Sequence, residues 1–213
     1  MGWGIIAVLL LGALLAFIVI QASFASRQWD RVIAAGDVNA LGEALDTAFD
    51  GWRARRAPRG TPPADWQALL SAELVAADRD RCRVSLLAEP DLRVIDGQRE
   101  EVGDAPSVAR RAAVAMAERL LYEIPHVRFA ELQIDVGTEY RAPDGTTREE
   151  CLLSTRVTRA QAATADWDGG DTAAVLGEWR TRESARGRPL DPDQDALILP
   201  DEPGAVVVIR ERA

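Results

Sequence analysis

The sequence predicts an α+β domain that follows a single N-terminal transmembrane helix. Three observations predict this fold class: an uncharged apolar run near the N-terminus, strict alternation of apolar and polar residues in the middle of the chain, and helical spacing of apolar residues elsewhere. Of the 213 residues, 47% are hydrophobic and 28% are charged, which is typical of globular proteins. We expect an antiparallel sheet of four to five strands with helices packed on one face.

The apolar run extends from Trp3 to Ile20 and contains no charged side chain. Because a helix rises ~1.5 Å per residue, about 20 such residues cross a hydrocarbon core of ~30 Å. We therefore predict an anchor within residues 1–25, with residues 3–22 in contact with membrane lipid. A cleaved signal peptide is the alternative, since Ser23-Phe24-Ala25 offers small residues at two cleavage subsites. Against it, the run exceeds the ~7–15 residues of a usual h-region, and no Lys or Arg precedes it.

The charges beside the apolar run predict its orientation. Arg27 and Arg31 follow the run closely, and basic residues favour the cytoplasmic side of a membrane. The preferred localisation is a bacterial cell membrane, spanned once, with the domain in the cytoplasm. An extracytoplasmic domain remains the alternative.

Residues 26–62 are expected to form a juxtamembrane helical segment. Asp37 is a suitable N-cap for a helix from Val38 to Arg56, whose apolar residues recur every three or four positions. Three arginines form a basic cluster in its last turn: Arg53, Arg55 and Arg56. This cluster is interpreted either as solvated at the negative end of the helix dipole or as facing anionic lipid headgroups.

Residues 63–186 are expected to form the globular domain. A short helix is predicted from Ala64, and a longer one runs from Asp104 to Glu123. Period-two alternation predicts strands over Glu73–Ala77, Arg81–Glu89, Leu92–Ile95, Ala130–Arg141 and Glu149–Thr158, the last two joined as a hairpin. Helices are expected over Arg159–Ala165 and Thr172–Ala185.

The alternation gives the predicted sheet one apolar and one solvated face. The solvated face is interpreted as a surface for a protein partner, and it carries Arg83, Glu131, Gln133, Asp135 and Arg156. Cys82 and Cys151 are both expected on the apolar side. They are reduced if the domain is cytoplasmic, and they could pair if it is outside and their strands are neighbours.

Residues 187–213 form a tail rich in Pro and Asp that ends in a short strand, Ala205–Ile209, which is expected to pair with a sheet edge or a partner. Within the acidic loop 191–202, carboxylates occupy positions one, three, five and twelve of an EF-hand-like rhythm, namely Asp191, Asp193, Asp195 and Glu202. Calcium is therefore a possible cofactor. Ala196 replaces the glycine of such a loop, however, and Pro200 lies inside it, so a solvated linker is the competing interpretation.

No catalytic constellation is recognisable in the sequence. The only histidine, His126, follows Pro125 at the end of a predicted helix, and no phosphate-binding or metalloprotease motif occurs. The net charge of −9 disfavours nucleic acid as a partner. We therefore expect a membrane-tethered, non-enzymatic interaction or scaffold domain. The alternative is an extracytoplasmic ligand- or calcium-binding domain that uses the loop 191–202.

Overall fold

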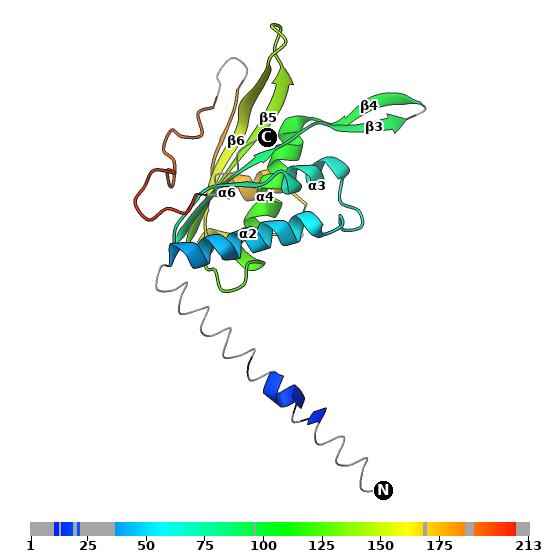
Figure 1. Ribbon diagram of the computed structural model, residues 1–213. Coiled ribbons are helices and arrows are strands. Elements are labelled where there is room, and N and C mark those ends of the chain that lie inside the picture. The colour runs from blue at the N-terminus through cyan, green and yellow to red at the C-terminus, as the bar shows by residue number, and fades with distance from the viewer. Residues whose placement is uncertain are drawn as a thin grey trace, which may run out of the picture.

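The computed structural model describes residues 11–12, 14–18, 21, 37–95, 97–167, 170–185 and 190–207 (Figure 1). Most of the predicted anchor, the basic residues that orient it and the start of the juxtamembrane segment lie outside these ranges. Within them, no helix combines the length and apolarity that a membrane crossing requires.

Helix α2 (Val38–Ala54) begins where the sequence predicts it. The side chain of Asp37 accepts hydrogen bonds from the backbone N–H groups of Asn39 and Ala40, so it caps the first turn as expected. Leu41, Leu45, Phe49 and Trp52 on α2 are buried in the same core as the rest of the protein. Helix α3 (Pro63–Leu70) follows, also as predicted.

Five strands form the main sheet in the order β1-β2-β5-β6-β7. They are β1 (Glu73–Ala77), β2 (Arg81–Leu87), β5 (Glu131–Arg141), β6 (Thr147–Thr158) and β7 (Arg180–Glu183). The expected strand number and the β5–β6 hairpin are confirmed. The expectation of a purely antiparallel sheet is wrong, because β2 and β5 pair in parallel and the sheet is mixed.

Helix α4 (Ala105–Tyr122) explains the parallel pair. It lies between β2 and β5 in the chain and packs against the sheet, so it carries the chain back to the end of the sheet from which β2 started. The side chain of Asp104 caps α4 through the N–H of Ser107, and the buried face of the helix is rich in alanine. The predicted helix is confirmed, but alternation along single strands does not report their relative direction.

Two other elements differ from the expectation. Residues 172–185, predicted as one helix, divide into α6 (Thr172–Glu178) and the edge strand β7, while α5 (Arg159–Ala162) is a single capped turn. Strand β4 (Gln98–Gly103) was not expected, because four consecutive polar residues lack apolar alternation. It pairs with β3 (Asp91–Ile95) in a separate hairpin that projects from the body (Figure 1).

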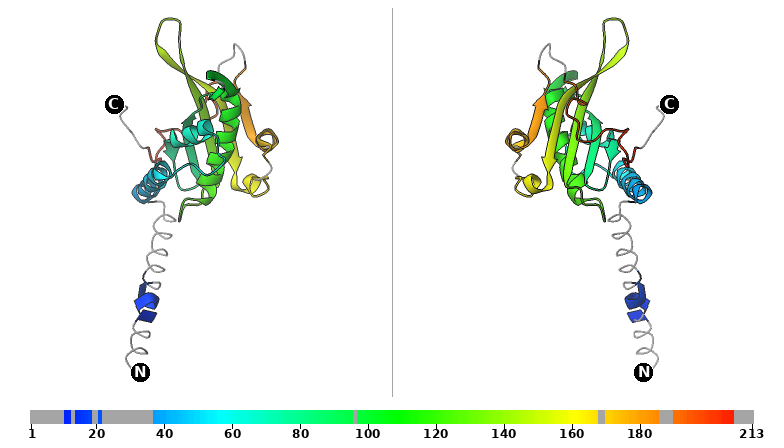
Figure 2. Two further views of the ribbon diagram at one scale, coloured as in Figure 1. Left: turned by 90° about the vertical axis from the view of Figure 1, so that its right-hand side faces the viewer. Right: turned by 90° about the vertical axis from the view of Figure 1, so that its left-hand side faces the viewer.

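The protein has three layers in the part that the structure describes. Helices α3 and α4 cover one face of the main sheet, and the C-terminal residues 190–202 cross the other (Figure 2). The core lies between the helices and the sheet, and it includes Leu45 of α2 and Val206 near the C-terminus. The sheet face that the sequence predicted to be solvated is therefore covered by the chain itself.

Candidate functional site

Polar side chains of neighbouring strands meet on the sheet face opposite the helices. Arg83 of β2 lies beside Gln133 of β5, which lies beside Arg156 of β6. Two residues further along, Asp135 of β5 lies beside Ser154 of β6. Side chains two residues apart on a strand point to the same face, so all five belong to one surface.

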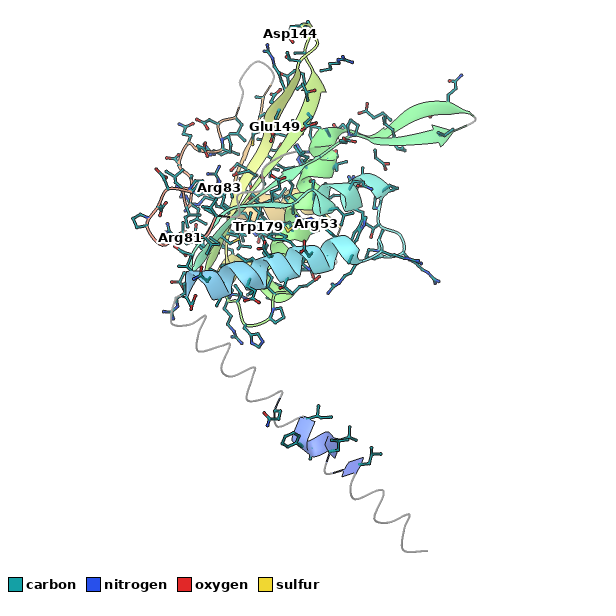
Figure 3. The ribbon with its side chains drawn as sticks, in the orientation of Figure 1. Arg53, Arg81, Arg83, Asp144, Glu149 and Trp179 are labelled. Atoms are coloured by element: carbon teal, nitrogen blue, oxygen red, sulfur yellow. The ribbon has the colours of Figure 1, made fainter. Side chains whose placement is uncertain are left out.

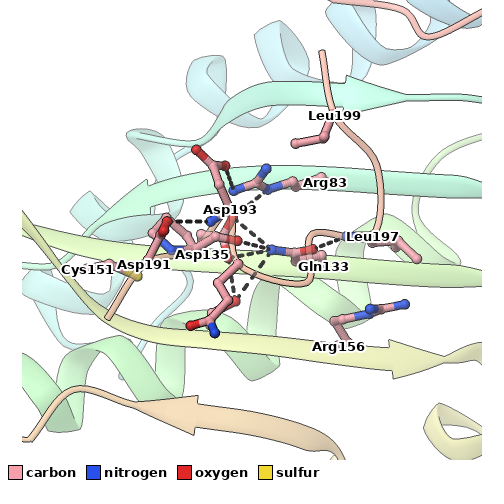
Figure 4. A network of polar contacts seen from close by, with 12 residues as sticks. Arg83, Gln133, Asp135, Cys151, Arg156, Asp191, Asp193, Leu197 and Leu199 are labelled. Carbon is pink, nitrogen blue, oxygen red and sulfur yellow. Dashed lines mark hydrogen bonds and ion pairs between the residues drawn. The ribbon is translucent and has the colours of Figure 1, made fainter. Parts of the chain in front are cut away.

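A buried network of hydrogen bonds joins the polar side chains at the centre of this face (Figure 4). Asp135 accepts hydrogen bonds from Arg83 Nε at 2.7 Å, from Ser154 Oγ at 2.6 Å and from Gln133 Nε2 at 2.9 Å. The side chains of Arg83 and Asp135 are only 3% and 6% exposed. A buried carboxylate that accepts three hydrogen bonds holds its donors in fixed orientations. The network therefore presents Arg83 and Gln133 as a preorganised surface.

The C-terminal residues 190–202, here called the strap, lie directly on this surface. Gln133 contacts the strap with both ends of its amide: Nε2 donates to the carbonyl of Pro192 at 3.1 Å, and Oε1 accepts from the N–H of Leu197 at 2.6 Å. Arg83 forms an ion pair with Asp193 at 2.7 Å between Nη2 and Oδ1. The face thus binds both main-chain groups and one carboxylate of the strap.

Three further arginines bind the strap around this centre. Arg81 donates to the carbonyl of Leu197 at 2.8 Å and to Glu202 at 2.9 Å. Arg156 donates to the carbonyl of Asp195 at 3.1 Å, and Arg182 donates to that of Gln194 at 2.7 Å. Figure 3 shows Arg81 and Arg83 on the side of the sheet where the strap lies, whereas Arg53 belongs to the last turn of α2. The four arginines come from β2, β6 and β7.

The strap also has an apolar anchor. Ile198 is fully buried and Leu197 nearly so. Beyond the strap, Val206 pairs with Ala77 at the edge of β1 through two backbone hydrogen bonds of 2.7 and 3.0 Å. The expectation that the apolar C-terminal segment pairs with a sheet edge is confirmed at this residue, whereas residues 208–213 lie outside the described part of the chain.

One buried donor on the face is not satisfied. Within the described residues, Arg83 Nη1 has no hydrogen-bond partner, although Nε and Nη2 are both paired. Burial lowers the pKa of the Arg83 guanidinium, but Asp135 and Asp193 outweigh that effect and raise it above its ordinary value. Arg83 therefore stays charged, and the strap leaves one of its N–H groups without an acceptor.

Two of the four residues predicted to bind calcium use their carboxylates in ion pairs with arginines. Asp193 pairs with Arg83, Glu202 pairs with Arg81 and accepts from the N–H of Leu199, and Asp191 accepts from the N–H of Asp193. Asp195 binds Arg156 through its backbone carbonyl. Across the described ranges, no group of three or more potential metal-binding side chains converges. Asp193 and Asp195 thus contact residues of the predicted partner surface, and the calcium site stays a prediction.

The basic cluster on α2 makes contacts within the protein. Arg53 pairs with Asp50 at 3.1 Å and donates to the carbonyl of Ala72 at 2.8 Å. Arg55 pairs with Glu123 at 3.0 Å, and Arg56 is exposed. Two of the three arginines thus link α2 to neighbouring segments.

The two cysteines lie on different faces and are both free. Cys82 is buried in the core, as expected. Cys151 lies beside the network on the strap face (Figure 4), so its predicted position is wrong. The reason is a shift of register between β5 and β6, after which Leu152 instead of Cys151 packs against the core. The strands β2 and β6 that carry the cysteines are separated by β5.

The structure brings all five predicted partner-binding residues together, with Glu131 paired to Arg156 at 2.9 Å. Sequence reasoning missed Arg81, Ser154 and Arg182. Arg81 could have been found, because it alternates with Arg83 on the same strand. Arg182 could not, since its segment was predicted to be helical.

Comparison of the chain with protein-family models, with curated proteins and with solved structures gave no match.

Proposed function

We propose that this chain is a membrane-tethered, non-enzymatic interaction domain that binds a protein partner through the arginine-lined face of its sheet. One observation carries the proposal: this face holds a segment rich in turns through arginine and glutamine side chains fixed by a buried network. Main-chain carbonyl groups occur in every peptide, and an arginine that pairs with a carboxylate adds recognition of an acidic side chain.

The chemistry of the face supports binding rather than proton transfer. Arginine remains protonated in proteins, and the raised pKa of Arg83 reinforces this. Its planar guanidinium is suited to hold carboxylate and carbonyl oxygens. The Gln133 amide acts as donor and acceptor at once without titrating.

The membrane tether in this proposal comes from the apolar run Trp3–Ile20, with the domain on the cytoplasmic side. A reporter enzyme fused after Ala213 tests the orientation, since reporters active on one side only distinguish the two topologies. Recovery of the native protein in a carbonate wash supernatant would contradict the tether.

Site-specific cross-linking tests the binding face. Arg180 is exposed on β7 and lies beside Arg156, so a photoreactive amino acid at position 180 samples the edge of the face. Glu118 is exposed on α4, which covers the opposite side of the sheet, and it provides the matched control. In cells that make the full-length protein, we expect one defined cross-linked partner from position 180 and none from position 118. Equal yields at both positions, or no adduct at position 180, would contradict the proposed face.

A further inference from the structure

We propose that the strap is an internal ligand of the binding face, and that the partner contributes an acidic segment that displaces it. This inference rests on the proposed function and adds to it the chemical class of the partner segment and a regulatory role for residues 190–202. Four observations support it: what the face recognises, the charge of the strap, the unsatisfied donor of Arg83, and the exposure of the outer contacts.

The face recognises few side chains of the strap. Gln133, Arg81, Arg156 and Arg182 all bind backbone carbonyl groups, which every peptide has. Side-chain recognition is limited to the carboxylates of Asp193 and Glu202, which pair with Arg83 and Arg81, while Leu197 and Ile198 are the buried aliphatic side chains of the strap. A competing segment therefore needs acidic residues for the two arginines and an aliphatic residue between them.

Charge complementarity selects an acidic segment. The strap contains four aspartates and one glutamate and no basic residue. The face presents four arginines to it, and three carboxylates of the domain, those of Asp78, Asp135 and Glu131, offset part of their charge. A basic or neutral segment would leave these guanidinium groups poorly neutralised. The occupant for which this face is suited is therefore an acidic peptide of another protein.

The strap is an incomplete ligand at the centre of the face. Arg83 is almost fully buried, yet within the described residues its Nη1 lacks an acceptor. A partner segment that places one more oxygen at this position satisfies a donor that the strap leaves unpaired. Such a segment gains one hydrogen bond that the strap does not make. The strap competes with it because it belongs to the same chain and therefore has a high effective concentration at the face.

The outer contacts of the strap are open to competition. The side chain of Asp193 is 68% exposed although its partner Arg83 is buried, and the bonds from Arg156 and Arg182 to the strap are also exposed. Displacement can therefore proceed contact by contact, with water replacing each carbonyl in turn. Only the buried positions of Leu197 and Ile198 must be refilled by apolar groups.

Peptide binding in trans tests the inference with the full-length protein. The probe is a fluorescent peptide with the sequence of residues 190–203, and the readout is fluorescence anisotropy. In the Asp193→Ala protein the strap no longer pairs with Arg83, so it competes less well with a peptide that still carries the aspartate. We therefore expect this variant to bind the peptide at least fivefold more tightly than the wild-type protein does, which is about 1 kcal/mol.

Two variant peptides are matched controls for that gain. A peptide carrying Asp193→Ala should lose the gain, because it no longer supplies an acceptor to Arg83. A peptide carrying Asp195→Asn should keep it, because Asp195 binds Arg156 through its carbonyl alone and asparagine also tolerates the φ of 62° at this position. Equal losses for the two peptides would indicate unspecific attraction of acidic chains and would overturn the inference.

Hydrogen exchange decides the question without any substitution in the protein. In wild-type protein, excess peptide should accelerate exchange of the Leu197 amide, which is bonded to Gln133, while β5 and β6 stay protected. Unchanged protection of Leu197 at a peptide concentration that saturates the Asp193→Ala variant would mean that the strap is a permanent layer of the fold. Dimers in light scattering whose straps are exchanged between copies would also overturn the inference. The cross-links from position 180 report on the proposed function independently of these results.

Discussion

Removal of the Arg83 guanidinium tests whether the polar face depends on its buried network. In Arg83→Ala, the carboxylate of Asp135 loses a donor at 2.7 Å while remaining only 6% exposed. Removing one partner of a buried pair costs about 3–5 kcal/mol, because the other charge is left without compensation. Asp135 keeps its hydrogen bonds from Ser154 and Gln133, which favours the lower end, about 3 kcal/mol.

Thermal unfolding followed by circular dichroism measures this effect. For a domain of this size, about 1 kcal/mol shifts Tm by ~2–4 °C, so Arg83→Ala should lower Tm by about 6–12 °C. Asp193→Ala removes only a well-exposed partner and should lower it by about 2–4 °C, which corresponds to about 1 kcal/mol. A double variant, Arg83→Leu with Asp135→Leu, removes both charges and should recover most of the loss. If Arg83→Ala melts within about 1 °C of the wild-type protein, these charges are hydrated and the buried network is refuted.

Three further predictions concern the remainder of the domain. Burial raises the pKa of Asp78, but hydrogen bonds from Asp80 and Arg81 outweigh this and lower it below its ordinary value of 3.8; hydrogen bonding to Arg110 likewise lowers the pKa of Glu183 below 4.5. The stability that these carboxylates contribute is present above the ordinary values and is lost as the pH falls through the lowered ones, so Asp78→Asn should flatten acid unfolding curves. Burial raises the pKa of Cys151 to about 12 and that of Cys82 further, so neither thiol should be alkylated near neutral pH in the folded protein, whereas both thiols should react after unfolding. Asp193→Ala should speed the labelling of Cys151 alone, because Cys151 lies on the face that the strap covers and Cys82 lies in the core. Leu45 is fully buried, so Leu45→Ala should cost about 2–5 kcal/mol in denaturant unfolding, and a loss below about 1 kcal/mol would mean that α2 is not part of the core.

Local signals in the sequence predicted several elements correctly, among them α2, α4 and the β5–β6 hairpin. Asp37 and Asp104 cap α2 and α4 as expected, because a short acidic side chain next to an apolar helical pattern satisfies N–H groups at the helix start. The β5–β6 hairpin follows from alternation on both sides of a turn. These features depend on residues that are close in the chain, which a single sequence reports directly.

Relations between distant segments were not predictable in the same way. The parallel pairing of β2 and β5 depends on where α4 returns the chain, and the edge strand β7 depends on pairing with β6. Alternation identifies the residues that share a face but not what covers that face. The polar residues of β2, β5 and β6 thus predicted a solvated surface, although Gln133 and Arg83 are almost completely buried.

Two features that the sequence predicted as separate sites form one site in the structure. The partner surface around Arg83 and the acidic loop around Asp193 were each noted for their charge, and their signs are opposite. An excess of arginine on one strand face and of aspartate in a proline-rich tail could have predicted their association. Sequence alone gives no register for such a contact, because the strap lacks a periodic pattern.

The chemistry of the contact argues that the strap can be released. The opposite face of the same sheet is aliphatic, and an aliphatic surface would cover the sheet with equal or greater stability, since buried ion pairs are costly to desolvate. A surface of arginine, aspartate and glutamine differs from an aliphatic one when the strap is displaced. Its polar groups are then hydrated by water, so the open state exposes little apolar area. Leu197 and Ile198 are the exceptions, because both side chains are buried and any replacement of the strap must fill their place with apolar groups. The polar network thus lowers the cost of opening, whereas these two apolar side chains limit which segments can take the place of the strap.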